Sequence, residues 1–400
     1  MNVLTITASN YLASGAARIA MSLHGHALAR DAHSRMYVGK KYGNDETIIE
    51  LRRSFVARAL SRVMANDVDF FRTDYLLDRP EFMAADLVHC HNLNGWYFNL
   101  KTIVKMSRVK PVVWTLHDMW ALTPHCGHTS SMETRNGLLK CSDQALYPTT
   151  AWNNDWYLSW RKSLLYAQGK FGLVAPCHWL KGWSEKTCLK GKVLAVIPNG
   201  VDTDIFTVRG DWRSLRHAMG LNPMPVVTFV GSALRSNVYK GFTDFVWLAE
   251  NWPDSKVQFV AIGAEKDGHL GRIRLVRATT DQEKVACYLA ISDVLVVPSR
   301  HEVFPLVVLE ALSSGVPIVA YDVGGIREAI EGLPACHLVP PLNRRCLVKL
   351  LGESLGEYIP NRAEISAKLR NEALEKYSVQ AMTRSYWRLY QEVMSRGCAG

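Results

Sequence analysis

Two glutamates eight residues apart, Glu302 and Glu310, have the type and spacing that most directly suggest chemistry. The apolar run from Val294 to Val297 predicts a buried strand, and the stretch 305–314 predicts a helix with proline in its first turn. A strand that turns into a helix exposes backbone N–H groups and the positive end of the helix dipole, so it can hold a phosphate. The two carboxylates beside this corner can then accept hydrogen bonds from hydroxyl groups.

A family resemblance is carried by the segment PSRHEVFPLVVLEALSSGVPIVAYDVGG around these glutamates. It resembles the E-x7-E signature of retaining, nucleotide-sugar-dependent glycosyltransferases of the GT-B fold, in particular family 4. Other stretches are similar to motifs of the same family and follow in the expected order. They are Ser14–Arg18, His89–Asn92, Trp114–Trp120, Ile197–Asp202 with Phe206, Lys240–Phe242, Asp293 and Pro298–Ser299. The resemblance therefore covers nearly the whole chain.

A nucleotide-sugar donor requires a site that stabilises the departing diphosphate. Lys240 is a compact cation suited to this charge, although a surface lysine can also be merely solvated. The resemblance implies that Glu310 accepts hydrogen bonds from the ribose and that Glu302 touches the transferred sugar. A glutamate pair can instead form a structural cap or an ion pair. The predicted donor-binding residues are Gly15, Arg235, Lys240, Glu302, Phe304, Pro305, Leu306, Val307 and Glu310.

The backbone near Pro305 and the glycines of two loops have separate physical reasons to lie near the diphosphate. Backbone N–H groups near Pro305 supply neutral donors to the phosphate, although Pro305 itself has none. Gly15 allows the first loop to approach the diphosphate, but small residues there also simply pack a helix on a sheet. The loop at Gly324 has the same two interpretations.

Two positions depart from the family pattern. Many relatives carry an arginine where this chain has Ser232, and Arg235 in the same predicted loop is the candidate replacement. Val303 replaces a glycine that is common after the first glutamate, which narrows the sugar pocket or shifts its backbone.

His117 follows the predicted strand 112–116, and the resemblance implies that it contacts the transferred sugar. A lone histidine is otherwise more often structural, and Asp118 either orients its ring or caps the next turn. The predicted catalytic residues are therefore His117, Glu302 and Lys240. The resemblance implies a same-face reaction without a covalent nucleophile, in which the leaving phosphate helps to deprotonate the acceptor.

His125, Cys126, His128 and Cys141 carry metal-binding atoms, but their spacing matches no strong zinc template. An acceptor-side loop is the favoured interpretation of these residues. No Asp-x-Asp motif stands at a suitable strand end, so neither a metal nor another cofactor is expected.

Strand-like runs alternate with helical stretches, which predicts an α/β fold with parallel, doubly wound sheets. The predicted strands are 3–7, 34–38, 87–90, 112–116, 172–175, 193–197, 226–230, 257–262, 294–297 and 318–320. They divide into two Rossmann-like domains, 1–199 and 200–379, and the terminal helix 380–400 completes the first by resemblance. Because ligands bind beyond the carboxyl ends of such strands, the site is expected in the cleft between the domains.

Composition agrees with a globular protein of two domains. The chain has 400 residues, of which 48% are hydrophobic and 21% charged, and no apolar run approaches the roughly 20 residues of a membrane-spanning helix. The start lacks a basic leader region, so a cytoplasmic location is expected. The nine cysteines are odd in number and irregularly spaced, which favours free thiols.

The positive charge is concentrated in the first half, with a net +9 in residues 1–200 against +1 in residues 201–400. This bias favours an anionic partner such as a membrane leaflet or a lipid pyrophosphate, whereas no nucleic-acid-binding signature is present. The stretch 51–65 predicts a helix with Leu51, Phe55, Ala59 and Val63 on one face and arginines around it. Such a helix lies on an anionic membrane or packs on the sheet.

Three tryptophans, at 152, 156 and 160, are spaced to share one helical face. They are a core stripe or, at a site edge, a surface for sugars or a membrane interface.

Together these patterns predict a retaining hexosyltransferase, peripheral on the inner face of the cytoplasmic membrane. It would move a sugar from a nucleotide-sugar to a hydroxyl of a lipid-linked saccharide or polysaccharide in bacterial surface glycan synthesis. A GT-B epimerase or phosphorylase, and a non-catalytic partner with the same fold, remain as alternatives.

Overall fold

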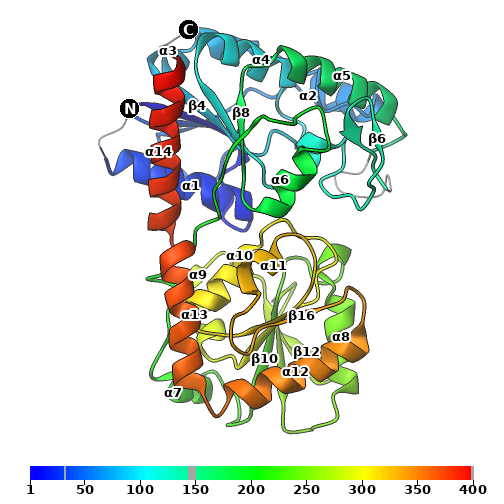
Figure 1. Cartoon of the computed structure of the whole chain (residues 1–400), viewed down its shortest axis with the longest axis vertical. Helices are drawn as coiled ribbons and strands as arrows, with labels where there is room; N and C mark the ends of the chain where they lie inside the picture. Colours follow the sequence, from blue (N-terminus) through cyan, green and yellow to red (C-terminus); the bar gives the residue numbers. More distant parts are fainter. Residues whose placement is uncertain (31–32, 143–149, 398–400) are drawn as a thin grey trace. The chain divides into compact units, whose positions relative to one another are not determined.

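The computed structural model describes residues 1–30, 33–142 and 150–397, which form two compact α/β units (Figure 1). The first unit comprises Met1–Pro198 and Thr383–Gly400, and the second comprises Asn199–Met382. Each contains a seven-stranded sheet with helices around it (Figure 1). Two doubly wound units are the fold class that the alternation of strands and helices predicts.

The sheet of the first unit is parallel, with strand order β3-β2-β1-β4-β5-β8-β9. Its strands are β1 (Val3–Ser9), β2 (Arg35–Lys40), β3 (Ile48–Glu50), β4 (Leu87–Cys90), β5 (Val112–Thr115), β8 (Gly172–Ala175) and β9 (Val193–Val196). Its helices are α1 (Gly15–Leu28), α2 (Phe55–Val63), α3 (Pro80–Ala84), α4 (Leu100–Val109), α5 (Asp155–Gln168) and α6 (His178–Ser184). Strand order reverses between β1 and β4, which is where doubly wound sheets place their ligands.

A small antiparallel hairpin of β6 (Thr134–Arg135) and β7 (Leu138–Leu139) precedes α5. The last helix, α14 (Val379–Gly397), groups with the first unit from Thr383 onward. Its Tyr386 hydroxyl lies 2.9 Å from Thr115 Oγ1, and its Tyr390 hydroxyl lies 2.7 Å from His89 Nδ1. These buried hydrogen bonds fix the helix on β4 and β5.

The second sheet has the order β12-β13-β11-β10-β14-β15-β16 and is parallel except for β12. Its strands are β10 (Val226–Val230), β11 (Gln258–Ala264), β12 (Gly268–Leu270), β13 (Ile273–Arg277), β14 (Val294–Val297), β15 (Ile318–Tyr321) and β16 (His337–Val339). The helices are α7 (Trp212–Ala218), α8 (Phe242–Asn251), α9 (Gln282–Ala290), α10 (Leu306–Ser313), α11 (Ile326–Ile330), α12 (Arg344–Tyr358) and α13 (Arg362–Lys376).

Asp293, part of the family resemblance, is buried at the amino end of β14. Its carboxylate accepts hydrogen bonds from Arg216 at 3.0 Å, from Arg362 at 2.6 Å and from the backbone of Val226 at 2.7 Å. Buried charges need such complete pairing. Asp293 therefore ties α7 and α13 to the end of the sheet opposite the loops that carry the predicted donor residues.

The predicted helix 51–65 is shorter in the structure, where α2 begins after the cap Ser54 and ends at Val63. It buries the small side chains of Ala57 and Ser61 and leaves Phe55, Ala59 and Val63 exposed. The alternative that this helix packs its apolar face on the sheet is therefore wrong.

The tryptophan stripe also differs from the prediction, because α5 begins at Asp155. Trp152 precedes the helix, and only Trp156 and Trp160 share a helical face. All three are exposed, so the stripe is not part of the core.

The cysteines were expected to be free, and this expectation is wrong for Cys126 and Cys141, which form a disulfide. Free thiols are found at Cys90, Cys177, Cys188, Cys287, Cys336 and Cys346. Cys398 lies outside the described residues. None of the helices in the described part of the chain is long and apolar enough to span a bilayer.

Candidate functional site

The loops that follow β10, β14 and β15 carry the predicted donor residues of the second unit. These three strands are neighbours in a parallel sheet, so their carboxyl ends share one edge. The loop after β10 leads to Lys240, the loop after β14 contains Glu302, and the loop after β15 contains Gly324. Sheet topology thus gathers residues that lie far apart in the sequence.

Lys240 and Glu302 form an ion pair, with 2.7 Å between Nζ and Oε1. The lysine side chain is 28% exposed and the glutamate side chain 10% exposed. The partial burial weakens screening by water, so the two charges hold one another in a defined position. Lys240 thus keeps an exposed part that can meet a ligand, whereas Glu302 is mostly buried.

Gly241 explains why glycine follows this lysine. It has a φ of +69°, and a Cβ atom there would lie 1.8 Å from the carbonyl oxygen of Pro298. The backbone N–H of Arg300 also donates to the carbonyl of Tyr239 at 2.7 Å. The Lys-Gly turn is therefore fixed directly on the chain that leaves β14.

Gly324 secures the other side of the Glu302 loop. Its φ is +62°, and a Cβ there would lie 2.0 Å from the carbonyl oxygen of Glu302. The backbone N–H of Gly325 donates to the carbonyl of Val303 at 2.8 Å. The glycine pair therefore packs against the candidate donor loop, and its closeness to the donor stays a prediction.

Helix α10 begins with the predicted phosphate-binding segment. Pro305 is its cap residue, and Leu306 and Val307 are the first residues whose N–H groups have no partner within the helix. Glu310 lies in the next turn and is 3% exposed, although every neighbour of it in α10 is apolar or small. A carboxylate at such a position is costly to bury and suggests a role beyond packing.

Phe304 and Val303 are buried within the second unit. The Phe304 ring lies 5.8 Å from that of Tyr377, and its carbonyl accepts a hydrogen bond from the Asn199 side chain at 2.8 Å. Phe304 therefore positions the loop from inside the unit.

Arg235 lies in the loop after β10 and is exposed, as is Ser232. Within the described residues no hydrogen bond or ion pair involves the Arg235 guanidinium. Its position leaves it available to an anionic ligand but does not fix it there.

In the first unit, His117 follows β5 and contacts His91, which follows β4. His91 Nδ1 and His117 Nε2 are 2.9 Å apart, and their rings are stacked at 5.2 Å. Burial lowers the pKa of His117 to about 4, and burial likewise lowers that of His91 well below its usual range. His117 is thus a neutral ring with one nitrogen engaged, which leaves the other for a ligand.

Asp118 caps the following turn. Its carboxylate accepts hydrogen bonds from the backbone of Trp120 at 2.9 Å and from the Asn94 side chain at 2.8 Å. Burial raises the pKa of Asp118, while these hydrogen bonds oppose the rise. Of the two predicted roles, the structure supports capping.

Gly15 is the first residue of α1 and is exposed, with Ser14 as the cap residue. It belongs to the first unit together with His117, whereas all the other predicted site residues belong to the second unit. The structure brings Lys240 into contact with Glu302 and places Glu310 one helical turn beyond their loop.

His91, Asn94 and Asn199 have no predicted role of their own, yet they hold His117, Asp118 and the Phe304 loop, respectively. A usable signal existed for one of them. His91 comes directly after a strand that is a sheet neighbour of the one before His117, so both loops share one edge.

Two family models match the chain, one mainly over the first unit and the other within the second. The model "Glycosyltransferase Family 4" matches residues 13–205, and "Glycosyl transferases group 1" matches residues 224–355. Together they account for most of both units.

Known proteins similar to the chain over their whole length include the putative colanic acid biosynthesis glycosyl transferase WcaC of Escherichia coli K12. That protein is 27% identical, and the match covers 95% of this chain and 97% of WcaC. The structure of sucrose-phosphate synthase from Thermosynechococcus elongatus superposes with a TM-score of 0.71 at 18% identity, covering 99% of this chain and all of the other. Anabaena Alr3699/HepE in complex with UDP-glucose gives a TM-score of 0.65 at 16% identity, with 99% and 100% covered.

Proposed function

Because the chain belongs to the family 4 glycosyltransferases, we propose that it transfers a hexose from a nucleotide-sugar to a hydroxyl acceptor with retention of configuration. The ion pair of Lys240 with Glu302 beside the start of α10 is the observation that carries this proposal. A cation, helix N–H groups and two carboxylates then face one ligand that has both phosphates and hydroxyls.

In the proposed donor complex, the diphosphate lies against Lys240 and the N–H groups of Leu306 and Val307. Arg235 supplies a second cation from the loop after β10. Glu310 accepts hydrogen bonds from the ribose, and Glu302 contacts the transferred sugar. Gly15 and His117 belong to the first unit and stay predicted site residues, with His117 as a neutral hydrogen-bonding group for the sugar.

The proposed reaction breaks the bond between the anomeric carbon and the diphosphate oxygen. A new bond from the acceptor oxygen forms on the same face of the sugar, and the acceptor proton passes to the leaving phosphate. Lys240 stabilises the charge on that phosphate as it departs. No metal or other cofactor is assigned a role in this proposal.

The acceptor is proposed from the relatives and from the surface of the first unit. WcaC is described as a colanic acid biosynthesis enzyme, and we extend that to a lipid-linked saccharide or a polysaccharide here. A nucleic-acid partner is not part of the proposal.

An apolar patch on the first unit suggests where such an acceptor would be met. The patch consists of Phe55, Val56, Leu60, Val63 and Met64 near α2, and Trp152, Trp156 and Trp160 near α5. The indole N–H of Trp152 donates to the carbonyl of Val63 at 2.8 Å, which joins the two groups. We propose that this patch docks on the anionic inner face of the cytoplasmic membrane.

The transferase proposal is tested by incubating the purified protein with UDP-, GDP- and ADP-sugars and measuring nucleotide release. We expect release from one donor class, and transfer to a saccharide acceptor with the α or β configuration of the donor preserved. Absence of both binding and release for every donor would contradict the proposal.

The site itself is tested by the variants Lys240→Ala and Glu310→Ala. The controls are Lys349→Ala and Glu364→Ala, which each remove one member of an exposed ion pair. Loss of one group that stabilises transition-state charge reduces kcat by about 10²–10³, which we expect for Lys240→Ala. Glu310→Ala is expected to weaken donor binding. Full activity of both site variants in folded protein would place the site elsewhere.

A further inference from the structure

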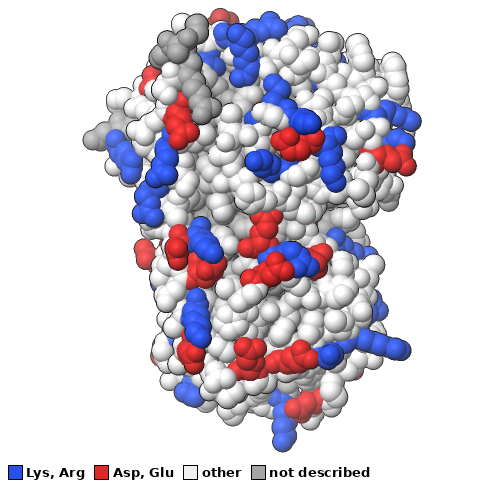
Figure 2. Space-filling model, viewed as in Figure 1, with Lys and Arg blue, Asp and Glu red and all other residues white. Residues whose placement is uncertain are grey.

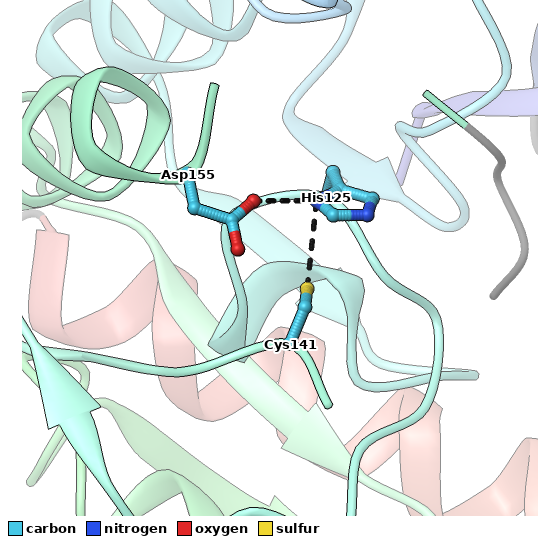
Figure 3. Close-up of side chains that lie close together, drawn as sticks. All are labelled: His125, Cys141 and Asp155. Carbon is cyan, nitrogen blue, oxygen red and sulfur yellow. Dashed lines mark hydrogen bonds and ion pairs between the residues drawn. The ribbon is translucent and has the colours of Figure 1, made fainter. Parts of the chain in front are cut away.

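Three side chains with metal-binding atoms meet in the first unit, beside the loop that follows the short 3₁₀ turn η2 (Trp120–Leu122) (Figure 3). His125 lies in that loop, Cys141 follows β7, and Asp155 is the first residue of α5. His125 Nδ1 lies 2.7 Å from Asp155 Oδ1 and 3.5 Å from Cys141 Sγ. The three candidate ligand atoms all lie within 4.8 Å of one another. The fold, and not a local motif, assembles this cluster.

A second sulfur adjoins this cluster through Cys141. Cys126 is bonded to Cys141 in the disulfide, and its backbone N–H donates to Cys141 Sγ at 3.2 Å. In this form neither sulfur carries the negative charge that a metal ligand needs. Reduction would place two thiols beside one imidazole and one carboxylate.

We propose that the reduced loop binds one zinc ion through His125, Cys126, Cys141 and Asp155, and that the disulfide is the metal-free form of this site. Zinc takes four ligands from sulfur, imidazole nitrogen and carboxylate oxygen in a tetrahedron. Thiolates disfavour magnesium and calcium, which prefer oxygen ligands. The inference is independent of the transferase function.

The distances fit this assignment. Zinc bonds of about 2.0–2.3 Å place two tetrahedral ligands roughly 3.3–3.7 Å apart. The 3.5 Å between Nδ1 and Sγ already has this value. The 2.7 Å between Nδ1 and Oδ1 is a hydrogen bond, so it must lengthen by roughly 0.6–1 Å when a metal replaces the shared proton. The two sulfurs, which are bonded in the disulfide, must also move apart on reduction to reach this spacing.

Conversion of the disulfide form into the zinc-bound form conserves electrons and protons. An external dithiol reduces the disulfide, giving up two electrons and two protons, and becomes a disulfide itself. Zinc then displaces the protons of both thiols, and the ring proton of His125 moves from Nδ1 to Nε2. Oxidation of the thiolates by the reverse exchange with a disulfide releases the metal.

The surroundings also suit the charge of the site. Two thiolates and one carboxylate exceed the charge of zinc by one negative unit. Lys162 is fully buried nearby and donates to the carbonyls of Trp120 at 2.8 Å and Thr123 at 3.0 Å. It is attracted most by Asp67, then by Asp118 and by Asp155. Burial lowers the pKa of Lys162 to about 7, and added negative charge would favour its protonated form.

The test measures zinc bound per chain in full-length protein, after removal of metals by chelation, in the reduced and in the disulfide form. We expect about one zinc ion in the reduced form and almost none in the disulfide form. Cobalt(II) in the reduced protein should give a thiolate-to-metal charge-transfer absorption. Equal binding by both forms, or no binding by the reduced form, would overturn the proposal without any variant.

Variants then identify the ligands. Cys126→Ser, Cys141→Ser and Asp155→Asn should each weaken zinc binding by more than the roughly 10–100-fold typical of a supporting residue. The matched control is Cys188→Ser, which removes an exposed free thiol of the same unit and should leave zinc binding unchanged. Circular dichroism would show that each variant is folded. If Cys188→Ser weakened zinc binding as much as the ligand variants do, the zinc would be bound by surface thiols.

Discussion

Lys240 already has a counter-ion, and this shapes what a donor must do at the proposed site. The pair with Glu302 is short and partly buried, so a diphosphate either shares the ammonium with the carboxylate or displaces it. Lysine offers three rotatable donors, which allows sharing. Glu302 would then turn toward the sugar hydroxyls while staying near the cation. A single ion pair can thus couple phosphate binding to the position of the sugar-contacting carboxylate.

The buried histidines of the first unit make stability depend on pH. Burial lowers the pKa of His89 to about 3, against about 6.5 when unfolded, so the unfolded chain takes up the proton first. The stability that neutral His89 contributes is complete above pH 6.5 and is lost as pH falls. Between pH 7 and pH 5 the loss is about 2 kcal/mol for each such histidine.

The variant His89→Gln should therefore lose about 2 kcal/mol less than the wild type between these two pH values. The measurement is the free energy of unfolding from urea titrations at pH 7 and pH 5. Exposed His269→Gln in the second unit is the control and should follow the wild type. An unchanged pH dependence in His89→Gln would show that this ring is protonated in the folded protein.

At the scale of elements, two glycines hold the candidate donor loops against the end of β14. Gly241→Ala combines a left-handed backbone with a Cβ placed 1.8 Å from the Pro298 carbonyl, so the Lys240 turn must move. We expect loss of stability beyond the roughly 1–2 kcal/mol of left-handed strain, together with loss of transfer. Thermal unfolding and nucleotide release measure the two effects.

The matched control for this prediction is Gly332→Ala. Gly332 has a similar φ of +79°, but nothing lies within 4 Å of the added Cβ. It should show the backbone strain alone and keep transfer. Equal behaviour of the two variants would mean that close packing at Pro298 does not determine the site.

Much of the element order could be predicted, because parallel buried strands are continuous apolar runs. β4, β8, β10 and β14 have the predicted bounds. Three of the strands that were not predicted, β3, β12 and β16, are three residues long and lie at sheet edges, where little apolar sequence is needed. The five-residue strand β13, which lies between β12 and β11, was also not predicted.

Contacts between distant segments were harder to predict than the elements themselves. The pair of Lys240 with Glu302 joins loops that only sheet order brings together. A zinc motif based on sequence spacing could not include Asp155, because this residue approaches His125 from the start of α5 and not from the same loop. The apolar face of α2 could not be assigned from the sequence, because an amphipathic pattern does not tell whether that face packs inside the unit or stays exposed.

At the scale of the whole molecule, charge and apolar surface together suggest attachment to an anionic membrane. The net charge of +9 in residues 1–200 comes with the apolar patch around α2 and α5. On the face shown in Figure 2, Lys and Arg are spread in small groups and do not form one continuous basic surface. Apolar insertion should therefore contribute alongside electrostatics, which we expect to appear as binding that salt weakens but does not abolish.

Sedimentation with vesicles tests this prediction by comparing neutral lipid with lipid containing an anionic component. Phe55 and Trp156 are 76% and 63% exposed, and burying one large apolar side chain contributes about 1.5–3 kcal/mol. The double variant Phe55→Ser/Trp156→Ser should therefore reduce binding to anionic vesicles by about tenfold or more. Leu342→Ser/Ile359→Ser removes exposed apolar side chains of the second unit and should bind like the wild type. Two results would contradict membrane docking through this surface. One is full vesicle binding by the double variant, and the other is a wild-type protein that sediments with neither kind of vesicle.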